Sequence, residues 1–285
     1  MKRYPSIPSV EDAPDGMFES GHLWVLEKID GALFRFQLRE SGLVRFGDRT
    51  RVYDDPDAIP APYEHAVRHV QRRLDRGALR NAVDDVESVV FFGVSTHRHA
   101  IEYDWDRLPS FLGFDVYSTG ADAFRPPGAT QGIFERLGLD PVNAFARELH
   151  TRDFDPESYS VPDSAWYDGP AAGVVIRNKR RGRATILNSN APTNDGTGSD
   201  LISPDTSAAE LAETYATDHR LRRLTSSLEA DGEAATVETL YDRAMAEIVR
   251  EHHTRLLDGA SSVDMSAFRS GVAARVRWFL DGTPG

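Results

Sequence analysis

One of only three lysines in the chain stands in a short motif whose residues could do nucleophilic chemistry. Lys28 is followed by Asp30 and Gly31, which gives the pattern Lys-x-Asp-Gly, whereas the other lysines are Lys2 and Lys179 and the remaining 30 basic side chains are arginine. Arginine keeps its proton and cannot act as a nucleophile, but a lysine amine can. Chance alone would produce roughly 0.02 such matches in this chain. We therefore interpret Lys28 as a candidate nucleophile.

The elements that must position this lysine are predicted to be strands. Leu23–Glu27 and Ala32–Leu38 show alternation and are rich in β-branched or aromatic residues, so they predict two strands with the lysine at the turn between them. A turn at the rim of a sheet exposes a side chain to a cleft. Further strands are predicted at 43–46, 50–53, 86–94, 111–117, 173–178 and 184–187, with one helix over 60–79 and one or two over 126–150.

The sequence changes character after residue 204. Residues 188–204 are rich in Asn, Gly, Ser and Pro and predict a linker. Ser207 and Glu210 then form a capping box, and three or four amphipathic helices are expected up to Leu280, closed by Gly282. The expected fold class is α+β, with a β-rich domain over residues 1–200 and a small helical domain over residues 205–285.

Composition favours a soluble cytoplasmic protein. The chain has no cysteine, which excludes disulfides and thiolate metal sites, and it lacks both a signal-peptide pattern and an apolar run that could span a bilayer. We therefore expect no membrane association. The net charge is -12, Asp (28) outnumbers Glu (17), and arginine almost replaces lysine, a combination that resembles proteins of salt-loving archaea. Such a charge does not exclude RNA, because a local arginine groove is sufficient.

The motifs follow one another in an order that resembles a known family. The Lys-Ile-Asp-Gly turn at 28–31 is followed by Phe-Phe-Gly at 91–93, Phe-Asp-Val at 114–116 and Gly-Val-Val-Ile-Arg at 173–177. Over most of residues 1–230 this series resembles the ATP-dependent RNA ligases, which are covalent nucleotidyltransferases. The resemblance implies a nucleotidyltransferase domain of packed antiparallel sheets, similar to ATP-grasp sheets, with a cleft between them.

The resemblance also implies a reaction and a set of site residues. In that family the lysine attacks the α-phosphorus of ATP to form lysyl-AMP, AMP passes to an RNA 5′-phosphate, and a 3′-OH displaces AMP as the ends join. By similarity Lys28 is the catalytic nucleophile, and ATP, Mg²⁺ and RNA ends are the cofactors and partners, as in RNA repair. The metal ligands and the oligomeric state are not indicated. The implied nucleotide-binding residues are Glu27, Asp30, Gly31, Arg49, Phe114, which would stack on adenine, and Arg177.

Three positions depart from the family pattern. Val94 and Ala172 stand where the family has glutamates, and Thr185 stands where it has a lysine. Those family residues contact ribose, hold the metal and bind phosphate. Losing a metal-holding carboxylate removes several kcal/mol of transition-state stabilisation, on the order of 10² to 10⁴ in rate. Replacement carboxylates are conceivable at Glu102, Asp104 or Asp115.

Two functions from different classes therefore stay open. The first is an ATP-dependent RNA ligase that works through Lys28. The second is a catalytically weakened or inactive ligase-family protein that binds nucleotide or RNA without sealing. A lysine-based enzyme unrelated to nucleic acids would require a different fold.

Two further groups of side chains bear on ligands. Arginines at and after the strand over 173–178 predict a place for RNA to lie, although a solvated turn would have the same composition: these are Arg177, Arg180, Arg181 and Arg183. His252 and His253 fall within a predicted helix. Neighbouring residues of a helix point in different directions, so the sequence predicts no metal site there.

Overall fold

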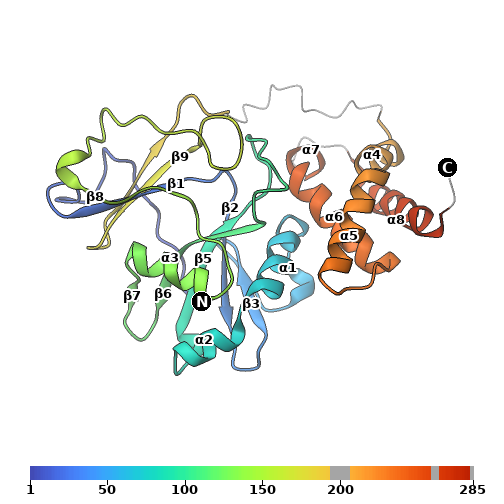
Figure 1. Cartoon of the computed structure of the whole chain (residues 1–285), viewed down its shortest axis with the longest axis horizontal. Coiled ribbons are helices and arrows are strands. Elements are labelled where there is room, and N and C mark those ends of the chain that lie inside the picture. The colour runs from blue at the N-terminus through green and yellow to red at the C-terminus, as the bar shows by residue number, and fades with distance from the viewer. Residues whose placement is uncertain (193–205, 258–262, 283–285) are drawn as a thin grey trace. The chain divides into compact units, whose positions relative to one another are not determined.

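The computed structural model describes residues 1–192, 206–257 and 263–282, which divide into two compact units. The first unit holds Met1–Ile59, Ala66–Thr96 and the described residues from 100 to 192. The second holds Pro60–His65, His97–His99 and the described residues from 206 onward. Figure 1 traces the elements of both. The domain boundary expected at 200–205 and most of the expected linker lie outside the described residues.

A four-stranded antiparallel sheet in the first unit carries the lysine motif at its rim. Its strand order is β10-β9-β1-β8, with β1 at His22–Glu27, β8 at Ala144–His150, β9 at Gly173–Asn178 and β10 at Arg183–Leu187. The inner strand β1 pairs with both β8 and β9, and its residues from Leu23 to Glu27 are buried. Pairing on both sides fixes the end of β1, and therefore the backbone that leads into Lys28.

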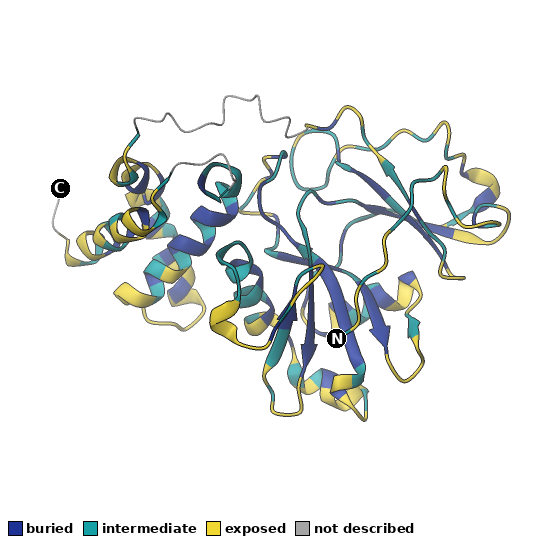
Figure 2. Ribbon diagram, turned by 180° about the vertical axis from the view of Figure 1, so that it is seen from behind, coloured by how far each residue is buried: buried dark blue, intermediate teal, exposed yellow. Residues whose placement is uncertain are grey.

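A six-stranded antiparallel sheet forms the rest of the β structure in the first unit. Its strand order is β4-β3-β2-β5-β6-β7. The inner strands are buried along most of their length, as Figure 2 shows, and stacked rings such as Phe36 and Phe91, with centroids 4.7 Å apart, fill the core beside them. The strands are β2 (Ala32–Leu38), β3 (Val44–Gly47), β4 (Val52–Tyr53), β5 (Val89–Ser95), β6 (Phe111–Ser118) and β7 (Ala123–Phe124).

The helix expected over 60–79 is divided into two. Helix α1 covers Glu64–Arg73 and α2 covers Arg76–Ala82, with short 3-10 turns at 56–58 and 61–63 before them. The division occurs because the carboxylate of Asp75 accepts a hydrogen bond from the Ala78 N–H at 2.8 Å and starts a new helix there. The backbone of Asp75 is extended, with φ -73° and ψ 92°, which interrupts the helical path, and its side-chain cap begins the next helix.

The expectation of only helices over 126–150 is wrong in its second half. Helix α3 covers Pro127–Arg136, but Ala144–His150 is the strand β8. Its residues are mostly good helix formers, yet pairing with β1 satisfies its backbone groups, with register shifts along the pair and Glu148 at a φ of 52°. Helix propensity is a weak preference, and tertiary pairing overrides it here.

The second unit is helical, as expected from residue 207 onward. The described helices are α4 (Ala208–Tyr215), α5 (Asp218–Ala230), α6 (Val237–Glu251), α7 (His253–Leu257) and α8 (Met265–Asp281). The capping box of Ser207 and Glu210 is present, and Gly282 ends α8 with a φ of 67°. Five helices form rather than three or four, because the chain turns at His252 between α6 and α7. No helix in the described ranges has both the length and the apolar character needed to cross a bilayer.

Antiparallel sheets followed by a helical C-terminal region confirm the predicted α+β fold class. The helical core is built from leucines and other apolar residues of α4, α5, α6 and α8, including Leu211, Leu224, Leu240 and Phe268. Two patterns in the sequence, alternation before residue 192 and helical spacing after 206, thus correspond to two kinds of core.

Candidate active site

A cavity of about 280 Å³ lies in the first unit, with walls from both sheets. Strands β1, β9 and β10 of the small sheet and β2, β5 and β6 of the large sheet all contribute side chains to it. Seven residues were predicted from the sequence to be catalytic or nucleotide-binding, and six of them line this cavity: Glu27, Lys28, Gly31, Arg49, Phe114 and Arg177. The seventh, Asp30, is not among the residues that line the cavity.

The lysine motif begins where β1 ends. The Lys28 N–H donates to the Gly173 carbonyl at 3.0 Å, which joins the motif to the start of β9. The side chain of Lys28 is half-buried and contributes to the cavity wall. The amine therefore projects from a backbone held by two neighbouring strands, and such support is what a precisely placed nucleophile requires.

The aspartate of the motif holds the turn together. The Asp30 carboxylate accepts hydrogen bonds from the N–H groups of Ala100 at 2.8 Å and Ile101 at 3.0 Å, and its own N–H donates to the Tyr103 hydroxyl at 2.9 Å. Burial raises the pKa of Tyr103, so this hydroxyl keeps its proton at neutral pH. Asp30 thus acts on the site by fixing the turn that carries the lysine.

Gly31 is required by close approach of the backbone. A Cβ atom at this position would lie 2.6 Å from the Ser95 carbonyl oxygen and 2.6 Å from a methyl group of Val94. Contacts this short do not occur in folded proteins, so β5 would have to shift. The glycine therefore lets β5 and the lysine turn share one side of the cavity.

Gly31→Ala is expected to lower the free energy of unfolding by about 1–3 kcal/mol, because the added methyl group overpacks a backbone contact. Gly120→Ala is a matched control, since a Cβ there meets nothing within 4 Å. Urea denaturation followed by circular dichroism measures both. Equal midpoints for the two variants would contradict this account of Gly31.

Glu27 is the one carboxylate among the described residues that line the cavity. Its side chain is buried and accepts hydrogen bonds from Asn143 Nδ2 at 3.0 Å, Ser164 Oγ at 2.5 Å and the Ala165 N–H at 3.3 Å. Burial raises the pKa of Glu27, and the hydrogen bonds oppose that rise. The carboxylate is therefore largely engaged within the protein.

The three departures from the family pattern lie in different places. Val94 and Thr185 both line the cavity, and the Thr185 hydroxyl donates to the Val174 carbonyl at 2.9 Å. Ala172 is not part of the lining and packs against the apolar cluster around Trp24 and Leu26. Two of these three positions therefore line the cavity and the third does not.

The suggested replacement carboxylates are not at the cavity. Glu102 and Asp104 do not line it. Asp115 is fully buried and accepts from Arg177 Nη2 at 2.9 Å, Arg183 Nη2 at 2.6 Å and the Tyr4 hydroxyl at 3.0 Å. Both oxygens of this carboxylate accept hydrogen bonds from buried side chains, so Asp115 does not replace a metal-holding glutamate.

Arg177 is a fixed cation in the cavity wall. Besides Asp115, its guanidinium donates to the carbonyl of Phe114 at 2.7 Å and to that of Arg125 at 3.1 Å. The side chain is only 4% exposed. A guanidinium with three partners keeps one orientation, and it sets the position of Phe114 beside the cavity.

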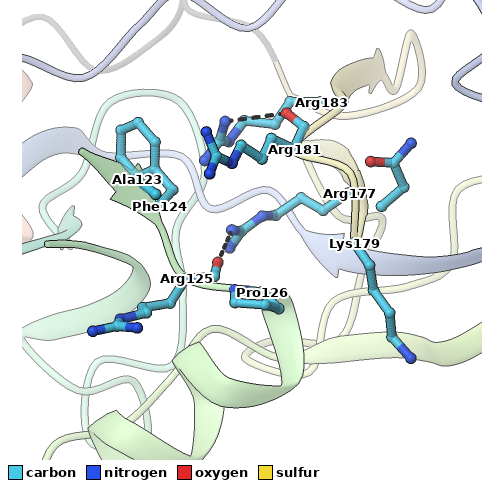
Figure 3. Close-up of a pocket in the computed structure, with 9 residues that line it drawn as sticks. Ala123, Phe124, Arg125, Pro126, Arg177, Lys179, Arg181 and Arg183 are labelled. Carbon is cyan, nitrogen blue, oxygen red and sulfur yellow. Dashed lines mark hydrogen bonds between the residues drawn. The ribbon is translucent and has the colours of Figure 1, made fainter. Parts of the chain in front are cut away.

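A second, basic pocket of about 270 Å³ adjoins this ion-pair cluster (Figure 3). Arg183 lies over the Phe124 ring, 4.3 Å from its centroid, while Lys179 points away from Arg177 and pairs with Glu148 at 2.7 Å. Of the arginines assigned to RNA from the sequence, Arg177 and Arg183 thus hold a buried ion pair, whereas Arg180 and Arg181 are exposed. The basic residues of the lining are Arg125, Arg177, Lys179, Arg181 and Arg183.

Two antiparallel sheets with a motif lysine on the wall of a cavity between them define a nucleotidyltransferase-type domain. The sequence profile of the RNA ligase family matches residues 21–188, more than half of the chain. The chain belongs to the RNA ligase family. No curated protein sequence matches it significantly.

Solved structures show the same fold at low sequence identity. RNA ligase of Naegleria gruberi, in a mutant form with ATP and Mn, matches with a TM-score of 0.51 and 15% identity over 66% of this chain and 56% of that one. Another mutant form of that ligase, with AMP and Mn, matches with a TM-score of 0.50 and 16% identity over 68% of this chain and 56% of that one. An archaeal ATP-dependent RNA ligase matches with a TM-score of 0.49 and 15% identity over 98% of this chain and 66% of that one. This chain therefore spans between half and two thirds of the length of these ligases.

Proposed function

We propose that the cavity of the first unit binds ATP and that Lys28 accepts AMP as the first step of joining an RNA 5′-phosphate to a 3′-OH. The observation that carries this proposal is the gathering of Lys28, Arg49, Phe114 and Arg177 around one cavity in a chain of the RNA ligase family. The Naegleria gruberi structures with ATP or AMP and Mn support it.

Each side chain has a role that its surroundings allow. Phe114 is half-buried and makes an edge contact with Tyr4 at 5.0 Å, which leaves an apolar ring surface for adenine. Arg49 is exposed and lines the cavity, where it would pair with a phosphate. Arg177 supplies a positive charge that does not move.

The proposed chemistry consists of three successive displacements at phosphorus. The neutral amine of Lys28 attacks the α-phosphorus, a nitrogen–phosphorus bond forms, the amine loses a proton to solvent and pyrophosphate leaves. An oxygen of the RNA 5′-phosphate then attacks the same phosphorus, the nitrogen–phosphorus bond breaks, and the nitrogen takes up a proton from solvent so that Lys28 leaves as an amine. Finally the 3′-OH attacks the 5′-phosphorus and loses its proton to solvent, and AMP leaves as the phosphodiester forms.

The described residues of the cavity do not form a complete Mg²⁺ site. Their single carboxylate, Glu27, already accepts three hydrogen bonds. Mg²⁺ commonly retains several waters and is held partly by substrate phosphates. A divalent ion that neutralises phosphate charge would therefore take most of its ligands from ATP and water rather than from this chain.

A second candidate function follows from the cavity lining. Val94 and Thr185 occupy it where the family has a glutamate and a lysine. This favours a weakened member of the family that binds nucleotide or RNA ends without sealing them. Incubation of the unaltered protein with nicked RNA, ATP and Mg²⁺ at high salt separates the two functions: sealed product excludes the second, and label transfer without sealing excludes the full ligase reaction.

Val94→Glu is expected to raise the initial rate of AMP transfer about tenfold or more, because it restores at the cavity wall a carboxylate that can accept a hydrogen bond from the ribose of ATP, and a hydrogen bond to a charged group is worth about 1.5–3 kcal/mol. Val175→Glu is the matched control: it also adds an acid to the cavity lining, but from β9. The rate is measured with ATP labelled at the α-phosphate. An unaltered protein faster than Val94→Glu would contradict the idea that the valine weakens the reaction.

A further inference from the structure

Three histidines of the second unit lie together although they come from two distant segments of the chain. His97 and His99 belong to the short segment 97–99, and His253 is the first residue of α7. The ring centroids are 4.7 Å apart for His97 and His99, 4.5 Å for His97 and His253, and 5.4 Å for His99 and His253. One nitrogen of each ring lies within 4.8 Å of the others.

The backbone around the three rings is held in place by hydrogen bonds. The Arg98 N–H donates to the Arg250 carbonyl at 2.9 Å. The hydroxyl of Thr254 lies near the carbonyls of both Arg98, at 3.1 Å, and His99, at 3.0 Å. Because Thr254 follows His253 directly, these bonds fasten the segment 97–99 beside the start of α7. These hydrogen bonds between the two segments therefore hold the three rings close together.

The spacing of the nitrogens suits one metal ion. Three nitrogens at 2.0–2.1 Å from a tetrahedral Zn²⁺ lie about 3.4 Å from one another. The observed separations of at most 4.8 Å exceed this value by no more than about 1.4 Å.

The donor set selects the kind of metal. Within the described part of the chain this group consists of three imidazoles without a carboxylate. Imidazole nitrogen suits zinc and its transition-metal neighbours, whereas Mg²⁺ and Ca²⁺ prefer oxygen ligands. Three protein ligands leave a fourth position for water. The metal that this group would bind therefore differs from the Mg²⁺ that accompanies ATP.

We propose that His97, His99 and His253 bind one Zn²⁺ ion within the second unit. The ion would link residues more than 150 positions apart in the sequence and fasten the segment 97–99 to α7. Such an ion stabilises the folded state, because the three ligands lie together in the folded chain and far apart in the unfolded one. The site does not rest on the proposed ligase function.

The test uses the full chain purified without a polyhistidine tag, stripped with a chelator and titrated with ZnCl₂. We expect one Zn²⁺ per chain by elemental analysis, and a rise in Tm of about 5 °C at a hundredfold excess of Zn²⁺ over its Kd. MgCl₂ at the same concentration is expected to leave Tm unchanged. Less than half an equivalent of bound zinc, or an equal rise with MgCl₂, would overturn the proposal.

Two substitutions locate the ion. His99→Gln and His253→Gln, made separately at half-buried positions, are each expected to weaken Zn²⁺ binding at least about a hundredfold, since each removes one of three ligands. His219→Gln, at an exposed histidine of the same unit, should bind like the unaltered protein. Circular dichroism confirms folding of each variant. Unchanged zinc affinity in either folded variant would place the ion elsewhere.

Discussion

Lys28→Ala is expected to lose all covalent transfer of AMP to the protein. Among the described residues, Lys28 is the one lysine that lines the cavity. The other two, Lys2 and Lys179, lie outside it and pair with carboxylates. Arginines of the lining cannot replace it, because a guanidinium keeps its proton. The measurement is retention of the label on the denatured protein after incubation with α-labelled ATP and Mg²⁺ at high salt.

Two further variants separate loss of the nucleophile from loss of the fold. Lys28→Arg keeps a positive charge and should be as inactive as Lys28→Ala, whereas Lys179→Ala should label like the unaltered protein. ATP binding measured by calorimetry should change far less than labelling does, since Phe114, Arg49 and Arg177 remain. Persistent label on Lys28→Ala would show that another residue accepts AMP and would remove the basis of the proposed function.

Asp115→Ala is expected to lower the free energy of unfolding by about 3–5 kcal/mol, more than Gly31→Ala. It removes the carboxylate shared by Arg177 and Arg183, whose side chains are 4% and 10% exposed, and leaves two buried cations without their counterion. The Tyr4 hydroxyl also loses its acceptor. Guanidinium denaturation followed by circular dichroism measures the change.

The control for this prediction is an arginine–aspartate ion pair whose carboxylate is exposed. Arg45 and Asp54 are 2.6 Å apart, but Asp54 is 69% exposed, so Asp54→Ala should cost less than about 1 kcal/mol. Asp115→Ala should also weaken ATP binding, because Arg177 would no longer hold the Phe114 carbonyl in place. Equal costs for the two substitutions would mean that burial adds nothing to the Asp115 cluster.

The lysine motif and the strands around it could be predicted from the sequence because their signals are local. Alternating side chains at 23–27 and 32–38 fixed the position of the turn to within a residue of the observed strands. The capping box at Ser207 and the glycine stop at 282 also act through neighbouring residues. By contrast, Ala144–His150 has a helical composition, and only its pairing with β1 makes it a strand.

The partners of charged side chains could not be predicted, because they lie far apart in the chain. Asp115 was one of three conceivable metal carboxylates in the sequence, and the fold instead buries it between Arg177 and Arg183. His253 adjoins His252 in a helix, and from the sequence this spacing predicts no metal site. His252 does point elsewhere, stacking on Tyr215 with centroids 3.9 Å apart, but residues 97–99 bring two more imidazoles to His253.

By itself the sequence determined the kind of chemistry: a rare lysine, an acid and a glycine at fixed spacing, followed by strand motifs in an order that resembles RNA ligases. Such features consist of residue types and their spacing along the chain, so they can be recognised without knowledge of the fold. Only the tertiary structure decided the company of Lys28. It brought Val94 and Thr185 into the same cavity lining as the lysine, bound the Asp30 carboxylate to the backbone at Ala100 and gave Arg177 to a buried ion pair. Contacts of this kind depend on long-range packing rather than on local pattern.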